Sequence, residues 1–155
     1  MLPLIALLAT FAVSDPTNSP SPDLARFHGL WDCKGQFASG KPTTATIGFS
    51  WSDKSGALAK IHDDLPPGGY HAQELWSVEP DGSLRGLIVA PNGARSITSE
   101  GWRDGALTFT HTRDATFAER FVYAFTAPDT LKIDWLTSRQ GALYKLGDTL
   151  TCQRR

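Results

Sequence analysis

The sequence has no run of like charges, no long apolar segment and very few cysteines. Its 155 residues include 15 basic and 16 acidic side chains, which give a formal net charge of -1. A nucleic-acid binder needs a basic stripe that neutralises phosphates, so we expect no nucleic-acid partner. Gly-x-Ser-x-Gly elbows and phosphate-binding glycine loops are also absent. Acyl transfer and nucleotide chemistry therefore have no support.

The apolar stretch at the start of the chain is too short to span a bilayer. Residues 2–13 carry no charge, but a membrane-spanning helix needs about 20 apolar residues. Ala12 and Ser14 occupy the small-residue positions of a signal-peptide cleavage site, so we predict a periplasmic or secreted protein without stable membrane insertion. An ordered first strand or a buried helix is the alternative. The predicted parts are a signal peptide (1–14), a flexible leader (15–22) and one β-barrel domain (23–155).

Only two cysteines occur, Cys33 and Cys152. An even count in an exported chain favours a disulfide, and two free buried thiols are the alternative. Apolar or small residues alternate with polar ones around each cysteine, which is the pattern of a half-buried strand. If the two cysteines face each other in an antiparallel pair, the register places Trp31 opposite Arg154.

Turn residues divide the chain into short alternating stretches, and no window has a helical period beyond one turn after Asp23. This pattern predicts an all-β fold, an antiparallel up-and-down β-barrel of about ten strands, with a two-sheet sandwich as the alternative. Pairing of the first strand with the last favours the barrel, because it removes the sheet edges. About ten strands leave an interior pocket. The predicted strands are 31–37, 43–51, 57–62, 70–78, 84–90, 95–102, 106–111, 117–125, 131–137 and 148–154.

Three short motifs resemble one protein family. Gly29-x-Trp31 with Arg154 resembles the lipocalin signature and its partner arginine. Residues 100–109 and 148–154 resemble the late strands of bacterial secreted lipocalin-like proteins without assigned activity. About ten strands and no C-terminal helix depart from true lipocalins. The resemblance implies a calycin barrel that is closed by Trp31 and Arg154 and binds something small and apolar, and it implies no catalytic residues.

The apolar faces of the predicted strands would line the barrel. Aromatic walls with few polar groups suit a flat or acyl ligand, although the same rings could simply fill a core. Phe125 and Ile133 lie on these faces as well. The predicted ligand-binding residues are Phe49, Trp51, Tyr70, Glu74, Trp76, Glu119, Phe121, Tyr123 and Trp135.

Glu74 and Glu119 each interrupt an apolar row. A buried carboxylate must be paired, or its pKa rises until it is neutral. Three roles remain open: an ion pair with Arg85, Arg95 or Arg120, an anchor for a ligand's amine or hydroxyl, and an acid–base pair of the glycosidase kind.

Histidines and carboxylates meet near the Pro-Pro-Gly-Gly loop. His62, Asp63, Asp64 and His71 could hold zinc at a barrel rim, but their spacing matches no compact metal motif. His111 alternates with apolar residues and could ligate haem iron if it points inward. We assign no metal and no cofactor from these patterns.

The favoured interpretation is a secreted or periplasmic lipocalin-like barrel that binds a small hydrophobic or amphipathic molecule. One alternative is a calycin-type enzyme that uses the interior carboxylates on a small substrate. The other is a structural envelope protein without a ligand.

Overall fold

The computed structural model describes residues 22–155, and the predicted signal peptide and leader lie outside them except for Pro22. These residues form one short helix and eleven strands. The elements are α1 (Pro22–Ala25), β1 (Gly29–Phe37), β2 (Pro42–Ser52), β3 (Ala57–Asp64), β4 (His71–Val78), β5 (Leu84–Ala90), β6 (Gly93–Ser99), β7 (Trp102–Arg103), β8 (Ala106–Asp114), β9 (Phe117–Ala127), β10 (Thr130–Arg139) and β11 (Lys145–Arg154).

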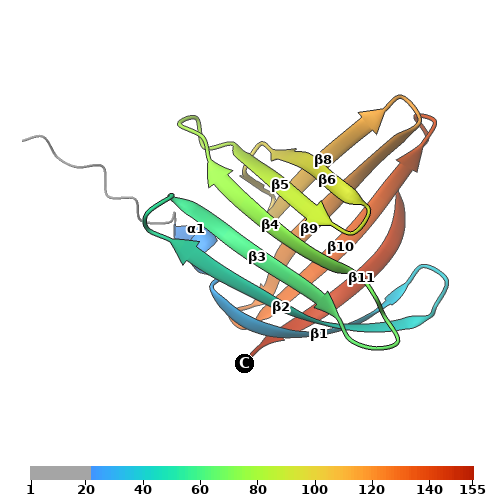
Figure 1. Ribbon diagram of the computed structural model, residues 1–155, viewed down its shortest axis with the longest axis horizontal. Helices are drawn as coiled ribbons and strands as arrows, with labels where there is room; N and C mark the ends of the chain where they lie inside the picture. Colours follow the sequence, from blue (N-terminus) through green and yellow to red (C-terminus); the bar gives the residue numbers. More distant parts are fainter. Residues whose placement is uncertain (1–21) are drawn as a thin grey trace, which may run out of the picture.

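Ten of the strands close into an antiparallel barrel, as the sequence predicts (Figure 1). Neighbours along the chain pair in order from β1 to β6 and from β8 to β11, and β1 also pairs with β11. The barrel closes between β6 and β8 through the single pair Thr98 and Thr110. The two-residue β7 pairs only with β8 and lies outside the ring of ten.

The first and last strands meet in the predicted register. Cys33 lies opposite Cys152, and the two form a disulfide. Trp31 lies opposite Arg154, whose guanidinium carbon is 4.1 Å from the centre of the indole ring. Arg154 also donates hydrogen bonds to the carbonyl oxygens of Arg26 and His28. This side chain therefore ties the segment before β1 to the last strand.

The predicted strand 95–102 extends too far at its C-terminal end. β6 stops at Ser99, and Trp102 belongs to β7. Gly101 lies between them with a φ of 89°, which a residue with a side chain rarely adopts. The ladder therefore breaks here, and the chain leaves the barrel wall before β8 begins.

One end of the barrel is closed by the segment after α1. The Phe27 side chain is fully buried. Its ring centre lies 5.0–6.0 Å from the ring centres of Phe49, Trp76, Trp102, Tyr123 and Phe125. This aromatic cluster fills the interior at that end, so any open space must lie toward the other end.

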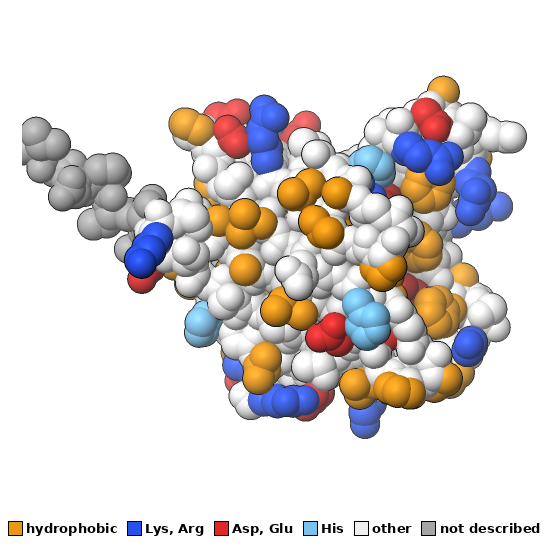
Figure 2. Space-filling model, viewed as in Figure 1, with side chains coloured by type: hydrophobic (Ala, Val, Ile, Leu, Met, Phe, Trp, Pro, Cys, Tyr) orange, Lys and Arg blue, Asp and Glu red, His pale blue; other side chains and the backbone are white. Residues whose placement is uncertain are grey.

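The outer faces of β3, β4 and β5 carry several exposed apolar side chains. Ile61, Leu75, Leu87 and Val89 are each about half exposed, and Figure 2 shows apolar side chains as separate groups over this face. Scattered exposed apolar residues are normal on a protein surface. Within residues 22–155, no helix has the length and hydropathy needed to cross a membrane.

Candidate ligand-binding cavity

The barrel holds a cavity of about 1080 Å³ in the half away from Phe27. Alternation along β9 and β10 turns Glu119, Phe121, Tyr123 and Trp135 inward, and Tyr70 precedes β4 at the rim. These five predicted ligand-binding residues line the cavity. It also includes Phe37, Ile133 and Leu150, so its walls combine aromatic, aliphatic and polar side chains.

The other four predicted ligand-binding residues lie outside the cavity lining. Phe49 and Trp76 are buried in the aromatic cluster with their ring centres 5.7 Å apart. Trp51 packs against the same core. Glu74 is buried beneath the cavity floor and reaches it only through the side chain of Lys60.

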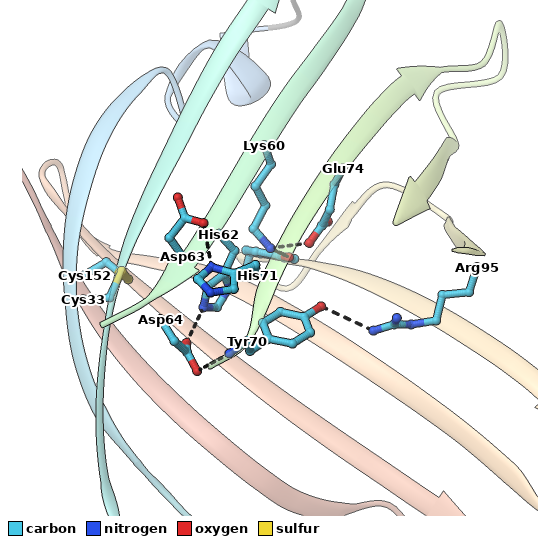
Figure 3. Close-up of polar contacts among 11 residues, drawn as sticks. Cys33, Lys60, His62, Asp63, Asp64, Tyr70, His71, Glu74, Arg95 and Cys152 are labelled. Carbon is cyan, nitrogen blue, oxygen red and sulfur yellow. Dashed lines mark hydrogen bonds and ion pairs between the residues drawn. A yellow bond between two sulfur atoms is a disulfide. The ribbon is translucent and has the colours of Figure 1, made fainter. Parts of the chain in front are cut away.

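Lys60 and Glu74 form the centre of a buried polar network (Figure 3). The Lys60 ammonium donates to Glu74 Oε1 over 2.6 Å and to the Tyr123 hydroxyl over 2.9 Å. Trp76 Nε1 donates to Glu74 Oε2 over 2.9 Å. Burial, together with the nearby charge of Glu74, raises the pKa of Tyr123 well above 10.0, so its phenol stays protonated.

Lys60 is a site residue that the sequence analysis did not identify. Its strand begins Ala57-Leu58-Ala59, in which every residue is apolar, so alternation there does not show which face is interior. In the structure Leu58, Lys60 and His62 share the inner face. The opposition of Lys60 and Glu74 in the β3–β4 ladder is the signal that could have revealed the pair.

The second interior carboxylate, Glu119, is held by groups from two other strands. Arg95 Nε donates to Glu119 Oε1 over 2.6 Å, and Trp135 Nε1 donates to Oε2 over 2.9 Å. Arg95 is one of the three partners that the sequence suggested for the interior carboxylates. Burial alone would lower the pKa of Arg95, but Glu119 and Tyr70 outweigh it and raise that pKa. The guanidinium therefore stays charged and bridges β6 to β9 across the weakly paired seam.

Both interior glutamates thus have each carboxylate oxygen occupied by a donor. Each carboxylate also has a cationic partner at ion-pair distance, Lys60 for Glu74 and Arg95 for Glu119. Of the three roles that the sequence left open for Glu74 and Glu119, this geometry matches the structural ion pair.

The histidines near the Pro-Pro-Gly-Gly loop form two separate pairs on opposite faces of β3. His62 lies 3.1 Å from Asp64 on the inner face, and His71 lies 3.0 Å from Asp63 on the outer face (Figure 3). Burial alone would raise the pKa of Asp64, but His62 and the backbone N–H of Tyr70 lower it. Within residues 22–155, no three histidine, cysteine or acidic side chains come together as a metal site.

His111 lines the cavity next to the barrel seam. Its Nδ1 lies 2.8 Å from the carbonyl oxygen of Ser96. This contact joins β8 to β6 close to Thr98 and Thr110, the one backbone pair of the two strands. The imidazole therefore supplements a ladder that is almost absent at this seam.

Asp148 is a second lining residue that the sequence analysis did not single out. It shares the inward face of β11 with Leu150 and Cys152, so the alternation around Cys152 could have found it. Burial raises its pKa from 3.8 to about 6, and the charges of Asp64 and Asp134 add to this effect. The carboxyl group therefore titrates close to neutral pH.

Comparisons with known proteins support the fold and go no further. No family model and no curated protein matches the sequence. Rv2717c from M. tuberculosis superposes with a TM-score of 0.60 at 13% identity, over 88% of this chain and 99% of its own. A Nostoc punctiforme protein of unknown function from the DUF3598 family gives 0.60 at 11% identity, over 92% of this chain and 53% of its own.

A third solved structure is the S-type phycobiliprotein lyase CPES from Guillardia theta. It superposes with a TM-score of 0.54 at 11% identity, over 86% of this chain and 90% of its own. Identities this low show a shared architecture alone. The chain thus shares the ten-stranded antiparallel barrel architecture of these structures.

Proposed function

We propose that this protein binds a small apolar or amphipathic molecule without covalent attachment, inside the open half of its barrel. The observation that carries the proposal is the cavity of about 1080 Å³ above a floor that is packed shut. Ligand pockets in proteins typically have volumes of about 300–1,000 Å³. The volume of this cavity is slightly above that range, which is room enough for a ligand of at least typical size.

The lining supports an amphipathic ligand. Phe37, Phe121, Ile133, Trp135 and Leu150 provide apolar walls, and burial of apolar surface contributes about 25 cal/mol per Å². Charged side chains lie on the same inner surface and would fix the orientation of a polar end. The Guillardia theta protein is named as a phycobiliprotein lyase. A barrel of similar architecture therefore occurs in a protein whose name indicates an activity on another protein.

Neither alternative function has a comparable observation in its favour. An enzyme that used Glu74 and Glu119 would have to act through two carboxylates that are each held by a cation and a tryptophan N–H, and Glu74 does not line the cavity. In a structural envelope protein without a ligand, a large interior cavity would only reduce stability, because unfilled space loses packing contacts.

Export is part of the proposal. The Cys33–Cys152 disulfide suits an oxidising compartment. The predicted signal peptide, residues 1–14, agrees with that compartment. We therefore infer that the barrel meets its ligand in the periplasm or outside the cell.

Native mass spectrometry of the protein purified from its own cells tests the proposal. A discrete mass excess that disappears on denaturation is expected. Calorimetric titration with octanol provides a second readout, with Thr43→Trp narrowing the cavity and Thr44→Trp placing the same bulk on the opposite face of β2. Thr43→Trp should change the octanol affinity and Thr44→Trp should leave it unchanged. A bare mass together with no octanol binding would refute the proposed function.

A further inference from the structure

The charged side chains inside the cavity are paired, with one exception. Arg113 and Arg139 are not counted here, because they lie at the rim of the cavity, where their side chains are exposed and contact the Phe117 ring. The half-buried Asp148 forms no ion pair within residues 22–155. The interior pairs are Lys60 with Glu74, Arg95 with Glu119, and His62 with Asp64.

A bulge fixes the position of Asp148. The register between β10 and β11 shifts between Trp135 and Leu136, so Asp148 lies opposite Trp135 on one side. On the other side it lies opposite Phe37 of β1. Side chains directly opposite each other in antiparallel strands are close neighbours. The carboxyl group is thus flanked by two aromatic side chains that line the same cavity.

The Asp148 carboxylate accepts a hydrogen bond from the backbone N–H of Trp135, but no cation is paired with it among the described residues. Asp64 of β3 and Asp134 of β10 act on it as negative charges, and the positive charge of Lys60 of β3 opposes them. Lys60 is already engaged with Glu74 and Tyr123. His62 is engaged with Asp64. A positive charge that entered the cavity next to Asp148 would therefore offset the repulsion that Asp148 receives from Asp64 and Asp134.

An ammonium group suits both the Asp148 carboxylate, which has no paired cation, and the two aromatic side chains that flank it. Charge-assisted hydrogen bonds from N–H donors to a carboxylate are stronger than neutral ones. Aromatic ring faces attract cations, by about 2 kcal/mol or more where water is excluded. A carboxylate ligand at this position would face the repulsion of Asp64 and Asp148, and the two buried cations of the lining, Lys60 and Arg95, are already paired with Glu74 and Glu119.

We propose that the ligand of this cavity is an amphipathic amine whose ammonium group pairs with the Asp148 carboxylate, beside Phe37 and Trp135. The rest of the molecule lies along Ile133 and Phe121 toward the floor. This inference rests on the proposed function of the cavity and adds the chemical class of its ligand.

Three probes of equal chain length test the inference: octylammonium, octanol and octanoate, each titrated calorimetrically well above the pKa of Asp148. Octylammonium should bind at least about tenfold more tightly than octanol, a difference of about 1.4 kcal/mol. Octanoate should bind more weakly than octanol. Asp148→Asn should remove the preference for octylammonium and leave octanol binding unchanged. Asp32→Asn, the same change at an exposed outer position of β1, should alter nothing.

The pH response gives an independent readout. Octylammonium affinity should fall as pH drops through about 6, because protonated Asp148 no longer pairs with the ligand. Asp64, His62 and Lys60 line the same cavity, and the charge of Asp134 acts from the outer face of β10, so the response is assigned to Asp148 by its disappearance in Asp148→Asn. Octanol affinity should show no such response.

The outcomes separate this inference from the function on which it rests. If octanol binds and octylammonium binds no more tightly, or if octanoate binds best, the amine inference is overturned and the cavity function stands. An octylammonium preference that survives Asp148→Asn would overturn the role of Asp148. If none of the three probes binds, the amine inference is overturned, and a bare native mass in addition would refute the cavity function as well.

Discussion

The buried Lys60–Glu74 pair should show strong energetic coupling. Both side chains are at most 3% exposed, and Glu74 accepts hydrogen bonds from Lys60 and Trp76 over 2.6 and 2.9 Å. Glu74→Gln keeps an oxygen for Trp76 but leaves the Lys60 ammonium without its counter-charge. Lys60→Met keeps the apolar stem but leaves the carboxylate without its cation. Removal of one partner of a buried pair costs about 3–5 kcal/mol.

The double variant Lys60→Met/Glu74→Gln should be more stable than either single variant, because it leaves no unpaired charge at these two positions. The coupling energy should then be about 3 kcal/mol or more, from urea unfolding followed by tryptophan fluorescence. The exposed pair Asp32–Arg155 is the control, and coupling across it should be much weaker, because water screens exposed charges. Additive losses for Lys60 and Glu74, within about 0.5 kcal/mol, would refute the reasoning.

The same unfolding assay tests three other features. Folding raises the pKa of Asp148 from 3.8 to about 6, so the folded state holds the proton more tightly and stability should fall as pH rises between these values. A flat profile, or a slope that persists in Asp148→Asn, would contradict this. Reduction of the Cys33–Cys152 bond should lower the free energy of unfolding by up to about 4.7 kcal/mol. A Cys33→Ser/Cys152→Ser variant should not respond to reductant, and peptide mapping that finds free thiols would remove the basis of this prediction. Arg154→Lys should cost about 1–3 kcal/mol, because an ammonium cannot lie flat on Trp31 and reach two carbonyls at once; an unchanged midpoint would show that this closure is dispensable.

The strands and their closure could be predicted from the sequence because the signals are local. Period-two alternation and turn residues place most strands within two residues of their ends. The register of β1 and β11 followed from Cys33 and Cys152 alone, since two facing residues fix every other pair in a ladder. The inward faces of β4 and β9 were correct for the same reason.

The division of the interior into a packed half and an open half could not be predicted. It depends on Phe27, which lies outside every strand and packs against residues from β2, β4 and β9. Alternation assigns Trp76 and Trp135 equally to the interior, yet one lies in the aromatic cluster and the other lines the cavity. The depth of a side chain along the barrel axis is a tertiary property that no periodicity encodes.

The disulfide also decides how the protein responds to proteolysis. Cys33 and Cys152 are 119 residues apart and enclose every loop from the β1–β2 turn to the β10–β11 turn. Exposed loop tips are the preferred sites of cleavage. A single cut at any of these loops leaves two pieces that are still one covalent molecule, held in place by their shared ladders. A nicked barrel would therefore separate into fragments only after reduction, and the cell could not clear it by one cut alone.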